Sequence, residues 1–290
     1  MDVVFRRYVE QCPDAVLVTD PAGTIVYANP AFEHMTGYAA AELVGRTPAL
    51  LKSGLHEADF YRRLWSTILA RQEFRALFAN RKKNGEPYHE DKIIRPLLDE
   101  AGRITHFISF GRDATERARE FDKLLHAATH DSLTDLPNRS LFLDRLGQAL
   151  RQAERRDEPL TLAILDIDRF RDTNTRYGHL GGDAVLQAVA GRTRACVRQA
   201  DTVARIGGDE LAILLVGAPE PQAAGVLAKI VAANAAPVGY EGQEIRATVS
   251  VGAAAYPGDG RDADTLRKHA DAAMYAAKTG GGNRVLFYRR

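Results

Sequence analysis

Between residues 15 and 110 the hydrophobic pattern is that of short strands and short helices. Apolar residues dominate Ala15–Thr19 and Thr24–Ala28, and the turn residues Asp20-Pro-Ala-Gly23 between them predict a β-hairpin. Helical spacing begins after Asn29, and a longer amphipathic stretch covers Asp59–Ala70. Three strand-like segments follow, separated by turns that contain Gly: Phe74–Asn80, Glu86–Leu98 and Thr105–Phe110. This part of the chain is expected to be a small α+β module built on an antiparallel sheet.

A charged segment without Gly or Pro joins this module to the rest of the chain. Between residues 115 and 130, the apolar residues Phe121, Leu124, Leu125 and Ala128 are spaced as on one face of a helix. The seam covers only about two heptads, which is short for a coiled coil. We expect a linker helix, and periodicity alone leaves open whether it is a plain surface helix.

The second half alternates strands with longer helical patterns. Predicted strands are Leu160–Leu165, Thr202–Ile206, Leu211–Val216, Glu244–Ala255 and Arg284–Tyr288. Predicted helices are Gly182–Val197, Ala223–Ala235 and Asp264–Lys278. The order βαββαβ, followed by αβ, predicts a ferredoxin-like core with an extension.

Composition fits two soluble globular domains. The chain has 290 residues, of which 45% are hydrophobic and 27% are charged, and a domain typically takes about 150 residues. The 39 basic and 38 acidic residues balance, so the net charge gives no indication that the chain binds a nucleic-acid polymer. Two cysteines, Cys12 and Cys196, are too few for a disulfide scaffold. This low cysteine count favours a reducing cytoplasm as the location, and no apolar run is long enough to span a membrane.

Four carboxylates stand where the predicted topology brings the first strand beside the following hairpin. Asp166 and Asp168 end one strand, and Asp209 and Glu210 lie in the predicted turn after Gly207-Gly208. Crowded carboxylates repel one another unless a cation lies among them, and hard oxygen ligands suit Mg²⁺ or Mn²⁺. Such a cation favours phosphoryl chemistry. A single Asp would more simply be a solvated surface residue, but the set predicts a metal site.

These residues resemble the GGDEF-domain diguanylate cyclases. The segment Arg205-Ile-Gly-Gly-Asp-Glu-Leu211 looks like the family signature, and the resemblance spans roughly residues 127–288. Four further blocks match in order: Asp131–Arg139, Asp166–Asn174 with Tyr177–His179 and Gly182-Asp183, Thr248–Gly252, and Ala270–Lys278. The resemblance implies a ferredoxin-like nucleotide-cyclase core that condenses two GTP into cyclic di-GMP and releases pyrophosphate.

The same resemblance implies a role for each matching residue. Metal ions would be held by Asp166, the Ile167 carbonyl, Asp209 and Glu210. Asp209 and Glu210 would be catalytic together with Arg171, which stands where the family has a lysine near the phosphates, and Asp209 would accept the proton of the 3′-hydroxyl. Substrate binding would involve Asn174 and Asp183 at the guanine edge, His179 in the same stretch, Gly207 and Gly208 in the turn, and Lys278 at the triphosphate tail. His179 fits a core histidine equally well.

Two positions depart from the family pattern. Leu211 replaces the Phe of the signature, an apolar exchange on a strand. Gly282 stands where a phosphate-binding arginine is expected. Losing one charge-assisted contact of about 1.5–3 kcal/mol weakens GTP binding roughly ten- to a hundredfold, unless Arg284 substitutes.

Arg198-Gln-Ala-Asp201 precedes Gly207 at the offset where the family places its inhibitory product site. Alone, an Arg and an Asp three residues apart would be a surface pair of little consequence. At this position they predict a site where Arg198 and Asp201 bind cyclic di-GMP.

The N-terminal half resembles a PAS domain over roughly residues 5–117. Matching residues are Asn29–Tyr38, Glu42–Gly45, Asn80–Gly85 and Asp113–Arg117. Trp65 and Asn80 are similar to residues of the flavin-binding PAS subgroup, which makes FAD one candidate ligand. The alternatives are an empty pocket or a small ligand, haem bound through His56, and a Trp65 that is simply a core aromatic.

Together these observations predict a PAS sensory domain (1–114), a signalling helix (115–130) and a GGDEF catalytic domain (131–290). Because each catalytic domain would hold one GTP, the expected form is a homodimer. Two alternatives stay open: another nucleotidyl cyclase on the same fold, and a degenerate GGDEF domain that binds cyclic di-GMP or GTP as a receptor. Intact Asp166, Asp209 and Glu210 argue against the receptor, and Gly282 argues for it.

Overall fold

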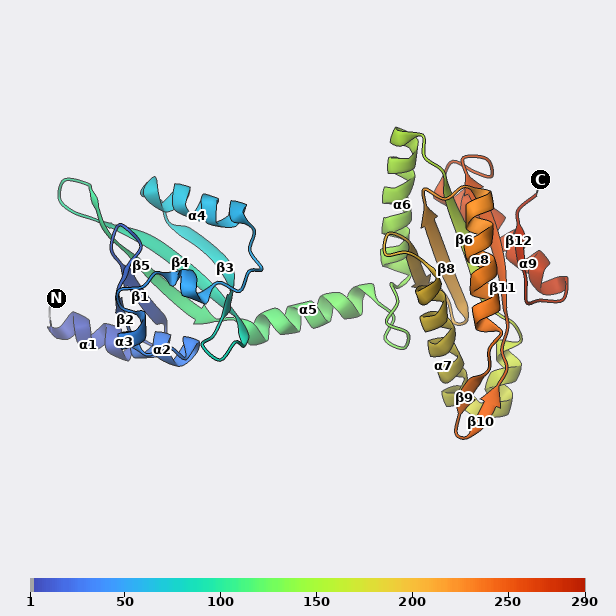
Figure 1. Cartoon of the computed structure of the whole chain (residues 1–290), viewed down its shortest axis with the longest axis horizontal. Helices are drawn as coiled ribbons and strands as arrows, with labels where there is room; N and C mark the ends of the chain where they lie inside the picture. Colours follow the sequence, from blue (N-terminus) through green and yellow to red (C-terminus); the bar gives the residue numbers. More distant parts are fainter. Residues whose placement is uncertain (1–2, 290) are drawn as a thin grey trace. The chain divides into compact units, whose positions relative to one another are not determined.

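The computed structural model describes residues 3–289. Its internal contacts divide the chain into two units, and the division falls between Leu124 and Leu125. Both residues belong to helix α5 (Thr115–Thr129), drawn in green in Figure 1. Each unit has its own sheet and its own core and is described by itself.

The N-terminal unit is built on one antiparallel sheet. Its five strands are ordered β2-β1-β5-β4-β3, and the hairpin of β1 and β2 and the three later strands confirm the predicted arrangement. The bounds are β1 (Ala15–Thr19), β2 (Ile25–Ala28), β3 (Phe74–Arg81), β4 (Pro87–Leu98) and β5 (Ile104–Asp113).

Short helices complete this unit, and two of them, α1 and the 3-10 helix η1, were not predicted. They are α1 (Val3–Gln11), α2 (Pro30–Thr36), α3 (Ala40–Leu43), the 3-10 helix η1 (Pro48–Leu51) and α4 (Ala58–Leu69). Helix α2 begins where it does because the Asn29 side chain accepts a hydrogen bond from the Phe32 amide. Helix α2 packs against β1, and α4 packs against β3 and β4.

The C-terminal unit has a second five-stranded sheet, ordered β12-β11-β6-β8-β7. Its strands are β6 (Leu160–Ile167), β7 (Thr202–Arg205), β8 (Glu210–Val216), β11 (Val249–Tyr256) and β12 (Val285–Phe287). Strands β11, β6, β8 and β7 lie side by side in this order, and each adjacent pair among them is antiparallel. Strand β12 joins β11 in parallel. This order confirms the predicted ferredoxin-like core with an added strand.

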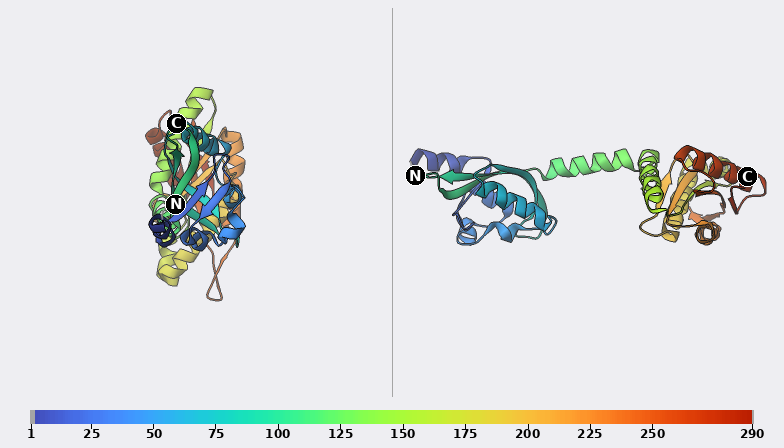
Figure 2. Two further views of the ribbon diagram at one scale, coloured as in Figure 1. Left: turned by 90° about the vertical axis from the view of Figure 1, so that its left-hand side faces the viewer. Right: turned by 90° about the horizontal axis from the view of Figure 1, so that it is seen from above.

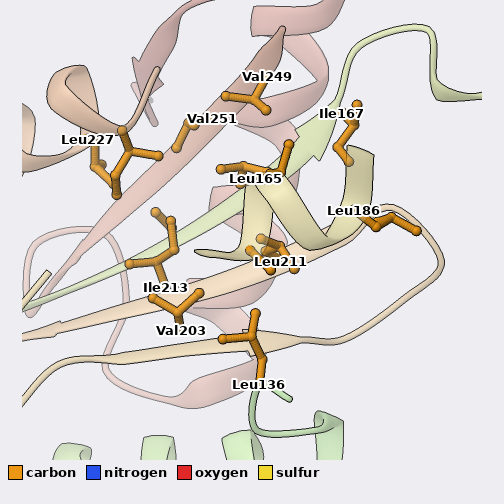
Figure 3. Close-up of a cluster of buried hydrophobic side chains, with 14 of the residues drawn as sticks. Leu136, Leu165, Ile167, Leu186, Val203, Leu211, Ile213, Leu227, Val249 and Val251 are labelled. Carbon is orange, nitrogen blue, oxygen red and sulfur yellow. The ribbon is translucent and has the colours of Figure 1, made fainter. Parts of the chain in front are cut away.

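Helices cover both faces of this sheet, so every residue of β6 is buried. Helices α7 (Phe170–Cys196) and α8 (Glu220–Asn234) supply one core, together with residues such as Val203 and Ile213 of the strands (Figure 3). Helices α6 (Arg139–Arg156) and α9 (Ala263–Thr279) supply the other. The two layers of helices are seen on either side of the sheet in Figure 2.

Two segments differ from the prediction. Glu244–Ala255 is not one strand: β10 (Gln243–Ile245) pairs with β9 (Val238–Tyr240) as a separate hairpin, and β11 begins only at Val249. Helix α7 begins at Phe170 rather than Gly182, and it is kinked at Gly178, whose φ of 73° and ψ of 174° are not helical. Only glycine adopts such a backbone easily, and the break hid the first half of the helix from a periodicity search.

Within residues 3–289, no helix is both long and apolar enough to cross a membrane. Cys12 and Cys196 are both free thiols.

Candidate active site of the C-terminal unit

The strand pairing places Asp166 and Glu210 directly opposite each other at the end of β6 and β8. Asp166 is buried and Glu210 is half-buried. This pairing confirms that the hairpin lies beside the end of β6. Asp209 directly precedes Glu210, in the turn after Gly207-Gly208. A Cβ at position 207 would lie 2.8 Å from Glu210 Oε2, so glycine leaves the room in which the Glu210 carboxylate sits.

Asp166 is electrostatically unusual. Burial, with added repulsion from Asp209 and Glu210, raises its pKa to about 6, even though Lys278 acts in the opposite direction. Lys278 Nζ lies 2.5 Å from Asp166 Oδ1. That oxygen is nevertheless buried without a hydrogen bond of good geometry to any described residue. Lys278 thus acts here as the countercharge of the carboxylate, whereas the sequence placed it at the triphosphate.

The carboxylates suit a divalent cation. Asp166 offers a buried oxygen without a proper hydrogen-bond donor, and Asp209 and Glu210 lie close enough to affect its pKa. Carboxylate and backbone carbonyl oxygens are the ligands that Mg²⁺ and Mn²⁺ prefer. Across residues 3–289, however, no three Asp, Glu, His or Cys side chains already converge as a ready metal site. The types of donor therefore suit a divalent cation, while these side chains do not converge on one point.

Asp168 does not join this group, contrary to the expectation of four crowded acids. Its carboxylate accepts hydrogen bonds from Thr248 Oγ1 (2.6 Å), Ser250 Oγ (2.7 Å) and the Asn283 amide (2.9 Å). All its contacts are on the β11 side of β6, away from Glu210. Asp168 therefore fixes the turn before β12 instead of binding a cation.

The Gly207-Gly208 turn is clamped by a residue pair for which the sequence predicted no role. Arg205 donates through Nη2 to the Gly208 carbonyl (2.8 Å) and through Nη1 to Asp131 Oδ1 (3.0 Å). Burial alone would raise the pKa of Asp131, but hydrogen bonds from Thr134 and Arg205 outweigh it and hold that pKa below its ordinary value. Both residues lie in segments that match the family, and this match was the only feature of the sequence that could have pointed to their role.

The predicted guanine-binding residues lie on the two sides of the α7 kink. Asn174 precedes Gly178 and Asp183 follows it, and neither side chain forms a hydrogen bond within the described part of the chain. A Cβ at Gly182 would lie 1.9 Å from Asn174 Oδ1, so the two halves of α7 are in contact at these positions. Arg171 and His179 are exposed; His179 is therefore not a core histidine.

The turn Gly280–Gly282 borders a polar cleft of about 830 Å³ that is also lined by Lys278, Arg176 and Arg246. Gly282 has a φ of +72°, and a Cβ there would lie 2.9 Å from Asp168 Oδ2. Arg284 folds back over the turn and donates through Nε to the Gly282 carbonyl at 3.1 Å. A guanidinium thus lies beside the position where the family has an arginine.

Arg198 and Asp201 do not form a surface ion pair. The Asp201 carboxylate is almost buried, and it accepts hydrogen bonds from the backbone amides of Arg198 (3.0 Å) and Val216 (3.2 Å). Asp201 thereby shapes the turn before β7. The Arg198 side chain is exposed and has no ionic partner among the described residues.

The N-terminal unit encloses a cavity of about 280 Å³ whose lining includes both Trp65 and Asn80. This is just below the range of about 300–1,000 Å³ that drug-sized ligands fill, so it does not fit a fully buried FAD. His56 is already engaged, because its Nε2 accepts a hydrogen bond from the Ala79 amide at 2.8 Å. That bond argues against haem ligation through this atom.

Comparison with known proteins agrees with both units. Residues 128–284 match the family described as diguanylate cyclase, GGDEF domain, and residues 5–114 match the PAS fold. The bifunctional diguanylate cyclase/cyclic di-GMP phosphodiesterase MucR of Pseudomonas aeruginosa is 47% identical over 176 residues, which cover 60% of this chain and 26% of MucR.

A signalling protein of Caulobacter vibrioides, itself uncharacterized, is 34% identical over 279 residues, which cover 94% of this chain and 33% of that protein. The chain thus spans about a third or less of the length of these two relatives. The crystal structure of the coiled coil and GGDEF domain of DgcB from Caulobacter crescentus, in complex with c-di-GMP, superimposes with a TM-score of 0.55 at 34% identity. It covers 59% of this chain and 92% of that chain. The chain belongs to the GGDEF family of diguanylate cyclases and carries a PAS domain ahead of its GGDEF domain.

Proposed function

We propose that the chain is a diguanylate cyclase that condenses two GTP molecules into cyclic di-GMP and releases two pyrophosphates. The observation that carries this proposal is the pairing of Asp166 with Glu210 across β6 and β8, beside Asp209 and Lys278. In each of two steps, the 3′-oxygen of one GTP bonds to the α-phosphorus of the other, and pyrophosphate leaves.

Asp209 would accept the 3′-hydroxyl proton. It is only half-buried, and the turn beside it is fixed by the hydrogen bond from Arg205 to the Gly208 carbonyl. Its carboxylate would therefore reach substrate while its backbone stays in place. Asp166, the Ile167 carbonyl, Asp209 and Glu210 would hold Mg²⁺ or Mn²⁺. When bound, such a cation neutralises triphosphate charge.

Recognition of the base is assigned to two side chains that form no hydrogen bond among the described residues. Asn174 and Asp183 supply the donor and acceptors that the guanine edge requires. Lys278 lines the polar cleft, and Arg284 donates to the Gly282 carbonyl in the turn that borders this cleft. Both would bind the phosphates, with Arg284 replacing the charge missing at position 282. Lys278 would leave Asp166 once a divalent cation binds there, because two cations compete for one carboxylate. The exposed Arg171 would supply further positive charge for the phosphates.

A homodimer is required because each GGDEF domain would bind one GTP. On α5, the side chains of Phe121, Leu124 and Leu125 are 65%, 70% and 53% exposed, which leaves the predicted apolar seam open. We propose that the α5 helices of two copies pair through this seam in the cytoplasm, where GTP is made. The exposed Arg198 would bind cyclic di-GMP as an inhibitor.

Gly282 favours a second candidate, a receptor that binds GTP or cyclic di-GMP without turnover. The two candidates are separated by incubating the full chain with GTP or ATP and Mg²⁺ or Mn²⁺, followed by chromatography of the nucleotides. A cyclase forms cyclic di-GMP from GTP and leaves ATP unchanged. Nucleotide binding by a dimer that makes no product would favour the receptor, and a cyclic product from ATP would indicate a different nucleotidyl cyclase.

A further inference from the structure

A buried ion pair lies in the core of the PAS domain. Glu90 and Lys92 are alternate residues of β4, and their side chains are only 0% and 6% exposed. Lys92 Nζ lies 3.0 Å from Glu90 Oε2. Burying two charges carries a desolvation penalty that apolar residues of similar volume would avoid. Neither residue belongs to the cyclase machinery, so the pair is unexplained by that function.

Glu90 is held firmly in place. Asn80 Nδ2 donates a hydrogen bond to Oε2 at 3.2 Å. The other oxygen, Oε1, lies over Gly111 of β5, where a Cβ would be only 1.9 Å away. Glu90 therefore acts as a fixed countercharge, and the position of the Lys92 ammonium is fixed with it.

The Lys92 ammonium faces the cavity of about 280 Å³. It lies 5.6 Å from the ring centre of Phe32 and 5.5 Å from that of Phe78, so its surroundings are mostly apolar. Within residues 3–289, Glu90 is the only group that forms an ion pair with it. An ammonium has three donors, so donors remain for a molecule in the cavity.

We propose that the PAS cavity binds a compact, mainly apolar molecule with a neutral oxygen acceptor such as a ketone, and that Lys92 donates to this oxygen. The rest of the wall is largely hydrocarbon and aromatic, including Leu17, Leu64, Ile68 and Phe107. A purely hydrocarbon ligand would leave the remaining Lys92 donors unsatisfied. A carboxylate would add a second buried negative charge to a pair that is already neutral.

Trp65 provides the readout, because it is the single tryptophan of the chain and lines this cavity. Its fluorescence is titrated in the full chain with three probes of matched shape: benzylacetone, a ketone; hydrocinnamate, the corresponding carboxylate; and isopentylbenzene, the hydrocarbon. We expect saturable binding of benzylacetone, about tenfold tighter than that of either other probe, as one hydrogen bond to a charged donor provides.

The decisive variant is Glu90→Gln/Lys92→Met, which removes both charges and keeps the volumes. It avoids the unpaired buried Glu90 that Lys92→Met alone would leave. The preference for ketone over hydrocarbon should vanish in the double variant and persist in Lys229→Met, which removes an exposed lysine of α8. The proposal would be overturned if wild type bound the ketone and the hydrocarbon equally well, or bound hydrocinnamate more tightly than the ketone. It would also be overturned if the double variant kept the preference, or if no probe gave a saturable change.

Discussion

Asp209 and Asp201 show how differently two aspartates of one motif region are used. Asp209 lies half-buried directly after Gly207-Gly208, whereas Asp201 is buried and accepts hydrogen bonds from two backbone amides. The sequence could group such residues by motif, and the strand register confirmed that Asp166 faces Glu210. It could not show that Asp168 turns away to Thr248 and Ser250, because that depends on contacts across β11.

Arg198→Ala tests the inhibitory site. The exposed guanidinium is expected to bind product, so its removal should raise the inhibition constant of cyclic di-GMP roughly ten- to a hundredfold and leave the uninhibited rate nearly unchanged. Titration of cyclic di-GMP at saturating GTP measures this shift. Arg261→Ala, which removes another exposed arginine, is the matched control. Superimposable inhibition curves for Arg198→Ala and wild type would rule out this site.

Arg284→Ala tests whether this residue replaces the arginine missing at position 282. Loss of a charge-assisted phosphate contact should raise the KM for GTP roughly ten- to a hundredfold. Arg284→Lys keeps the charge without the forked geometry, so its KM for GTP should lie between those of wild type and Arg284→Ala. Initial rates over a range of GTP concentrations give the comparison. An unchanged KM in Arg284→Ala would mean that Lys278 and other groups bind the phosphates without it.

At the scale of elements, the strands were predicted better than the helices. The strand order follows from the βαββαβ pattern, and nearly every strand was found within a few residues of its expected bounds. Helix α6 was not predicted, and the first half of α7 was hidden by the Gly178 kink, whose backbone places Asn174 and Gly182 in contact. Such a break disrupts the 3.6-residue period by which a helix is recognised in a sequence.

The Asp131–Arg205 clamp can be tested through pH. The lowered pKa of Asp131 in the folded chain means that its charged form adds stability above its ordinary pKa, and that this contribution is lost as pH falls. Asp131→Asn should therefore destabilise the GGDEF domain by about 1 kcal/mol at pH 7, with a difference from wild type that shrinks below about pH 4.

Urea unfolding followed by circular dichroism measures this difference. Trp65 fluorescence marks the unfolding of the PAS domain separately, because the only tryptophan lies there. A gap between Asp131→Asn and wild type that stays constant from neutral to acidic pH would show that the charge of Asp131 is not what the clamp uses.

For the whole molecule, the proposed reaction requires two copies to meet, because each would bind one GTP. The exposed seam of Phe121, Leu124 and Leu125 is the part of α5 suited to a second copy. The length of this seam fits both pairing and a plain surface helix. Measuring mass and activity on one and the same variant separates the two.

Leu124→Glu places a charge in the seam and should shift the chain toward monomer, with a fall in turnover that recovers at high protein concentration by mass action. Lys123→Glu changes the charge of the neighbouring residue and is the control. Light scattering coupled to gel filtration gives the mass. A Leu124→Glu variant that stays dimeric and fully active would place the dimer contact elsewhere.

The central claim is turnover at the Asp166, Asp209 and Glu210 edge. It is tested most directly by the rate of cyclic di-GMP formation from GTP by wild type and by Asp209→Asn, which keeps size and shape and removes the proton-accepting charge. Asp157→Asn, at a left-handed position that asparagine tolerates, controls for loss of an acidic residue elsewhere. We predict product from wild type and Asp157→Asn, and a rate lower by roughly a hundredfold or more for a folded Asp209→Asn. Wild-type activity in Asp209→Asn, or no product from a dimeric wild type that binds GTP, would contradict it.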